Sequence, residues 1–132
     1  MPKDARVLLL DDDRDFIDAM AFFLKSRGYE VHPEWAASEA LAKIKAGEAD
    51  VVFLDYAMPG MDGLRVLRAI RKSNADIPVV LVTAYTGEIE LRELSELGIE
   101  GIFPKTDNFI KLEQIIEVVL RMNKKLKPKS NP

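Results

Sequence analysis

Short apolar runs, each ended by a polar or turn-forming residue, recur along the chain. Two of them, at residues 7–10 and 51–54, lack the polar alternation of a strand with one wet face, so we expect these strands to be covered on both faces. Two more strands are expected at 77–82 and 99–103. A fifth run, 29–33, is weaker because Glu30 and His32 interrupt it. The pattern predicts five strands, with 29–33 at an edge.

The segments between these runs carry apolar residues at helical spacing. Glycines follow several of them, as is usual after a helix. The predicted helices run from 14 to 27, through Ala37 and Ile44 up to Gly47, onward from a candidate N-cap at Asp62, from about 87 to 97, and onward from Asp107-Asn108. Strands that alternate with helices through short loops predict a parallel sheet with helices on both faces.

The fold class that follows is α/β, a single doubly wound (βα)5 domain of the flavodoxin-like type. Right-handed crossovers permit few strand orders. The order 2-1-3-4-5 fits best, because it places the weak strand 29–33 at an edge.

Composition narrows the class of protein. The chain has 132 residues, 48% of them hydrophobic and 31% charged, which suits one globular domain. We assign this domain to residues 1–122 and a basic tail or start of a linker to 123–132. The net charge of −3 gives no reason to expect nucleic-acid binding, and the absence of cysteine excludes disulfides and thiolate metal sites. No apolar run approaches the roughly 18 residues of a membrane span, so we expect a cytoplasmic protein without a membrane partner.

Polar residues stand where the strong strands end. Asp11-Asp12-Asp13 follow the first strand and Asp55 the third, while Thr83 and Lys105 follow the fourth and fifth. In the predicted order these ends are neighbours along one edge of the sheet. Crowded carboxylates repel unless a cation neutralises them, and Mg²⁺ prefers oxygen ligands. Acids, a metal, a hydroxyl and an ammonium together suit phosphoryl transfer to a carboxylate, with Asp55 as the candidate nucleophile.

Four segments resemble the receiver domain of two-component response regulators, over residues 6 to about 122. They are Leu-Leu-Leu-Asp-Asp-Asp, Phe-Leu-Asp-Tyr-Ala-Met-Pro-Gly-Met-Asp-Gly, Leu-Val-Thr-Ala and Phe-Pro-Lys. The resemblance implies that Asp55 takes a phosphoryl group from a phosphohistidine on a histidine kinase or phosphotransfer protein. Such a domain assists its own phosphorylation and dephosphorylation, and it is a switch rather than a conventional enzyme.

The resemblance also implies a role for each site residue. Asp12 binds Mg²⁺ directly, Asp11 acts mainly through water, and Ala57 offers its backbone carbonyl beside Asp55. Lys105 pairs with the phosphoryl group and Thr83 donates its hydroxyl to it. Asp13 has no fixed role in the family, so we interpret it as a helix N-cap or an added negative charge.

The chain departs from the family pattern at the usual aromatic switch position, which is Ile102. Phe103 is adjacent, but strand alternation points it to the opposite face. Tyr85, two residues after Thr83, is either a substitute switch or a plain surface residue. Ala57 and Tyr85 flank the expected phosphate and neither activates water, so we also expect slow loss of the phosphoryl group.

Two other functions compete with the switch. A receiver-like interaction module that is never phosphorylated would explain the missing aromatic at Ile102. A haloacid-dehalogenase-type phosphatase would use Asp11-Asp12-Asp13, but Asp15 stands where that family has Thr or Val, and no cap segment is present.

For the switch, we expect an unidentified downstream protein, or a second copy of the chain, to bind the face of the fourth helix, fifth strand and fifth helix. We expect no catalytic role for His32, and packing for Trp35.

Overall fold

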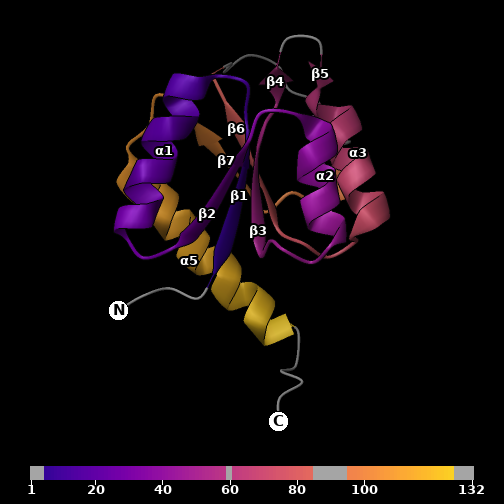
Figure 1. The fold of residues 1–132 in the computed structure, drawn as a ribbon. Helices are drawn as coiled ribbons and strands as arrows, with labels where there is room; N and C mark the ends of the chain where they lie inside the picture. Colours follow the sequence, from indigo (N-terminus) through magenta and orange to yellow (C-terminus); the bar gives the residue numbers. More distant parts are fainter. Residues whose placement is uncertain (1–4, 59–60, 85–94, 127–132) are drawn as a thin grey trace.

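A five-stranded parallel sheet with helices on both faces forms the domain in a computed structural model that describes residues 5–58, 61–84 and 95–126 (Figure 1). The sheet order is β2-β1-β3-β6-β7, which confirms the predicted order 2-1-3-4-5. Its strands are β1 (Arg6–Leu10), β2 (Glu30–Glu34), β3 (Val51–Asp55), β6 (Val79–Thr83) and β7 (Gly101–Pro104). The weak strand β2 lies at an edge, as expected.

The helices divide between the two faces of the sheet. The described helices are α1 (Arg14–Ser26), α2 (Ala37–Lys45), α3 (Gly63–Ser73) and α5 (Phe109–Leu126). Figure 1 shows α1 and α5 on one face and α2 and α3 on the other. Of the helix predicted at 87–97, residues 87–94 lie outside the described residues, and 95–97 are helical.

Both faces of each central strand are buried, which explains the unbroken apolar runs. Along β1, Val7 and Leu9 belong to the core under α1 and α5, and Leu8 and Leu10 to the core under α2 and α3. All five residues of β3 are buried. Because neither face of these strands meets water, their residues are apolar up to the carboxyl end, where the chain leaves the sheet.

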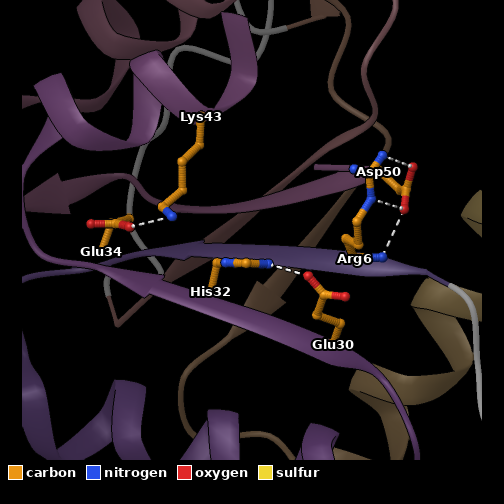
Figure 2. Close-up of polar contacts among 6 residues, drawn as sticks. All are labelled: Arg6, Glu30, His32, Glu34, Lys43 and Asp50. Atoms are coloured by element: carbon orange, nitrogen blue, oxygen red, sulfur yellow. Dashed lines mark hydrogen bonds and ion pairs between the residues drawn. The ribbon is translucent and has the colours of Figure 1, made fainter. Parts of the chain in front are cut away.

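The edge strand β2 carries polar contacts at the alternate residues Glu30, His32 and Glu34 (Figure 2). His32 Nε2 lies 2.6 Å from Glu30 Oε2, and Glu34 Oε2 lies 3.5 Å from Lys43 Nζ of α2. His32 pairs in register with Leu8 in the middle of β1, away from the carboxyl ends of the strands. The second pair helps to hold α2 over the edge of the sheet.

At the amino ends of the strands, Arg6 joins the start of β1 to the loop before β3. Its guanidinium makes two hydrogen bonds of 3.1 Å to the carboxylate of Asp50, and its backbone N–H makes a third of 2.7 Å (Figure 2). The hydrogen bonds that Arg6 donates to Asp50 raise the pKa of Arg6. These contacts align the beginnings of β1 and β3.

Strand and helix boundaries differ from the predicted ones by one or two residues. The ladder between β3 and β6 begins with Val52 and Val79, so β6 starts after Pro78. Gly28 follows α1 with a φ of 97°, a conformation that glycine adopts without strain, as its predicted role as a helix stop requires. A short antiparallel pair, β4 (Ala57–Met58) and β5 (Met61–Asp62), was not predicted.

Candidate functional site

The carboxyl ends of four neighbouring strands bring the predicted polar residues together. Asp11 directly follows β1, Asp55 is the last residue of β3, Thr83 is the last residue of β6, and Lys105 directly follows β7. The side chains of Asp11, Asp55 and Thr83 are buried, with 3–4% of each residue exposed. The Lys105 N–H donates to the Thr83 carbonyl at 2.8 Å, which fixes the loop after β7 against β6.

The ammonium of Lys105 lies between two buried carboxylates. Its Nζ is 2.9 Å from Asp11 Oδ2 and donates a hydrogen bond of 3.3 Å to Asp55 Oδ2. Burial disfavours the charge on Lys105, but the carboxylates of Asp11 and Asp55 outweigh this effect and raise its pKa. The ammonium therefore stays charged at neutral pH, where it can neutralise negative charge that develops beside Asp55.

Three carboxylates at this site can hold a metal ion. Oxygen atoms of Asp11, Asp12 and Asp55 all lie within 4.8 Å of one another. Asp11 Oδ2 is buried, and its contact with Lys105 lacks hydrogen-bond geometry, so it has no hydrogen-bond partner among the described residues. Burial raises the pKa of Asp11 to about 6, and the nearby Asp55 adds to this rise. An all-oxygen, carboxylate-rich set with one unsatisfied oxygen fits Mg²⁺.

Hydrogen bonds within the turn after β1 fix the position of Asp11. Its Oδ1 accepts from the Asp13 N–H at 2.9 Å, and Asp13 Oδ1 accepts from the Phe16 N–H at 3.1 Å. Asp13 is thus the N-cap of α1, one of the two roles considered for it. Asp11 is buried and points into the domain, whereas the neighbouring Asp12 is exposed and points to solvent.

The short β4–β5 pair returns the chain to the end of β3. Ala57 pairs with Asp62, and Asp62 caps α3 by accepting from the Leu64 N–H at 3.0 Å. Gly63 N–H donates to the Tyr56 carbonyl at 3.2 Å, and a Cβ at Gly63 would lie 2.5 Å from that oxygen. Only glycine permits this approach, which holds the start of α3 against the backbone of Tyr56, between Asp55 and Ala57.

The switch positions differ in what the structure describes. Ile102 is partly buried and packs against the core under α2 and α3, whereas Phe103 is fully buried in the core under α1 and α5. The predicted opposite orientation of these two side chains is confirmed. Tyr85 lies outside the described residues.

One site neighbour escaped the sequence analysis. The ring of Phe16, in the first turn of α1, lies 4.8 Å from Lys105 Nζ. The available signal was its place three residues after the N-cap Asp13, because the first turn of α1 starts beside the acidic cluster. Trp35 is 38% exposed and belongs to neither core cluster, so the packing role expected for it is limited to a contact with the guanidinium of Arg14, 4.6 Å from its ring centre.

Comparisons with known proteins agree with this geometry. The profile of the response regulator receiver domain matches residues 7–117. A receiver domain protein (CheY-like) from Methanospirillum hungatei is 26% identical, with a TM-score of 0.87 over 95% of this chain and 100% of that one. CheY4 from Vibrio cholerae is 29% identical, with a TM-score of 0.81 over 89% and 100% of the two chains.

A third solved structure is that of TrrA from Thermotoga maritima in complex with Mg²⁺ and BeF. It is 33% identical, with a TM-score of 0.77 over 88% of this chain and 99% of that one. This chain therefore belongs to the family of response regulator receiver domains, the class of two-component signalling proteins whose fold it shares. Within the described part of the chain, no helix is both long and apolar enough to cross a membrane.

Proposed function

We propose that this receiver domain accepts a phosphoryl group on Asp55 from a phosphohistidine of a histidine kinase or phosphotransfer protein. The observation that carries the proposal is the ammonium of Lys105 held between Asp11 and Asp55, 2.9 Å and 3.3 Å from their oxygens. Phosphoryl transfer needs positioning and neutralisation of charge. The ammonium supplies positive charge beside the buried strand end, and the clustered carboxylates would hold a metal ion that supplies more.

In the proposed reaction, a carboxylate oxygen of Asp55 attacks the phosphorus atom. A P–O bond forms, and the P–N bond to the donor histidine breaks, leaving the donor as the neutral imidazole once a proton is taken up. Lys105 neutralises one phosphoryl oxygen, and the hydroxyl of Thr83 donates to another. These groups stand at their strand ends before the donor arrives, so little reorganisation is needed during the reaction.

Asp11, Asp12, Asp55 and the backbone carbonyl of Ala57 are the groups that would hold Mg²⁺. When bound, the ion would neutralise charge on the phosphoryl oxygens and on the crowded carboxylates. Its charge would also offset the repulsion between Asp11 and Asp55 that contributes to the raised pKa of Asp11.

The output we propose is a change on the face formed by β7 and α5, together with the helix expected at 87–97. Thr83 ends β6, and its carbonyl accepts from the Lys105 N–H after β7, so a movement at Thr83 reaches β7 directly. The partner would be a downstream protein, or a second copy of the chain. We place the protein in the cytoplasm, where such kinases present their phosphohistidines.

The test is incubation with a small phosphoryl donor and Mg²⁺, read by intact mass. We expect the mass to increase by one phosphoryl group, and we expect no increase for Asp55→Asn or in EDTA. Asp18→Asn is a matched control, since Asp18 is an exposed acid on α1, and it should take up the phosphoryl group like the parent. A parent without adduct, or equal adducts on the parent and Asp55→Asn, would refute the proposal and favour an interaction module that is never phosphorylated.

A further inference from the structure

The ammonium of Lys105 has a third neighbour besides the carboxylates of Asp11 and Asp55. A lysine ammonium sits at the end of a flexible four-carbon stem, and two carboxylates alone leave it free to move between them. The face of Phe16 supplies this contact, with its ring centre 4.8 Å from Lys105 Nζ. A ring attracts the cation through its quadrupole but accepts no strong hydrogen bond, so it does not compete with the hydrogen bond from Lys105 to Asp55.

Phe16 is held through both its backbone and its ring. The backbone N–H of Phe16 donates to the N-cap Asp13, which fixes the start of the side chain. Its ring forms a T-shaped pair with the ring of Phe109 on α5, with centres 5.9 Å apart and planes at 67°. Phe109 in turn packs against Phe23 of α1 and Phe103 of β7, at 5.5 Å and 6.3 Å between ring centres.

These contacts close a circuit. Asp11 accepts from the Asp13 N–H, Asp13 accepts from the Phe16 N–H, the Phe16 ring faces Lys105, and Lys105 pairs with Asp11. Each member restrains the next, so the ammonium has one preferred place relative to Asp55. A leucine at position 16 would fill much of the same space but would present no ring face to the ammonium.

We propose that Phe16 is a positioning residue for phosphoryl transfer, which holds the Lys105 ammonium in the place where it meets the phosphoryl group. The inference rests on the function proposed for Asp55. It differs from ordinary core packing in one respect: the effect of Phe16 on the reaction acts through the charge of Lys105. An error of position near the reacting atoms lowers the rate steeply.

The test is a double-mutant cycle on the rate of phosphoryl uptake from a small donor at saturating Mg²⁺. Phe16→Leu should slow uptake by about tenfold, the effect of losing a partly desolvated cation–π contact. Phe16→Tyr, which keeps the ring, should restore the parent rate to within about twofold. In a Lys105→Met background, Phe16→Leu should add almost nothing, because the charge that it positions is gone.

Phe23→Leu is the matched control, because Phe23 also packs on Phe109 but has its own cation neighbour, Arg27, rather than Lys105. It should leave the rate of uptake unchanged. Phe16→Met serves as a second variant if Phe16→Leu does not fold. A further readout needs no metal: in EDTA, the losses of stability from Phe16→Leu and Lys105→Met should be less than additive.

Two results would overturn the inference while the proposed function stands. One is a rate of phosphoryl uptake in Phe16→Leu that equals that of the parent. The other is an equal slowing of uptake by Phe16→Leu in the presence and absence of Lys105, which would indicate packing alone. A parent chain that takes up no phosphoryl group would overturn the proposed function, and this inference with it.

Discussion

Replacing Asp11 by Asn should stabilise the metal-free domain at neutral pH. Burial raises the pKa of Asp11 from its usual 3.8 to about 6, so its ionised form is disfavoured in the folded state. Each pKa unit corresponds to about 1.4 kcal/mol, so above about pH 6 this ionisation costs the folded state ~3 kcal/mol. Asparagine removes the charge and keeps an oxygen that can accept from the Asp13 N–H. The raised pKa of Asp11 already includes the attraction of Lys105, and Lys105 keeps Asp55 as a partner, so we expect a net gain of about 2–3 kcal/mol.

The sign of the pH dependence follows from the raised pKa. Between about pH 4 and 6, folded Asp11 is still protonated while the unfolded chain has lost that proton. The stability contributed by this group is therefore present below its usual pKa and lost as pH rises through the window. The difference between Asp11→Asn and the parent should be small near pH 4 and should reach its full value above about pH 6.

The assay is urea denaturation in EDTA at several pH values, followed by the fluorescence of Trp35, the single tryptophan. Asp12→Asn is the control, since the exposed Asp12 should give little gain in the metal-free state. With Mg²⁺ the order should reverse, because the parent gains from the ion and both variants gain less. An Asp11→Asn variant that is no more stable than the parent in EDTA near neutral pH would refute the reasoning.

Three further predictions concern the scaffold. Gly63→Ala should destabilise the domain by about 2 kcal/mol or more, because its Cβ would meet the Tyr56 carbonyl at 2.5 Å; an unchanged denaturation midpoint would contradict this. Arg71 donates to the carbonyls of residues 74, 77, 97 and 98, and Arg71→Met should cost at least about 2 kcal/mol in thermal unfolding, with exposed Arg68→Met or a similar surface change as the comparison. Pro33→Val should promote self-association at high concentration, measured by light scattering, because Pro33 withholds an N–H from the open edge of the sheet; equal scattering by the variant and the parent would count against it.

The reason for the last prediction lies in the register of β2. Glu30 N–H donates to the Ala5 carbonyl and the Glu34 carbonyl accepts from Asp11, so alternate residues of β2 face β1. The backbone of Val31 and Pro33 therefore faces outward. A proline at that place leaves the edge without one of its donors, which hinders the addition of another strand.

Much of the fold followed from local pattern. Apolar runs such as 7–10 and 51–54 have to lie in a sheet that is covered on both faces. The first charged residues after these runs, Asp11 and Asp55, then stand at the carboxyl ends of the strands. The alternation of strands and helices restricts the strand order to few choices. For these reasons the sequence alone predicted the family fold and the group of side chains at the strand ends.

Only the tertiary structure decided how those side chains meet. The contact of Phe16 with Lys105 joins residues far apart in the chain, and no spacing in the sequence encodes the direction of a ring or an ammonium. The same holds for the approach of Gly63 to Tyr56, which reads in the sequence as an ordinary turn, and for Arg71, whose partners at 97 and 98 follow from packing. The strand pattern determines which residues reach the site, and side-chain packing between distant segments determines their geometry.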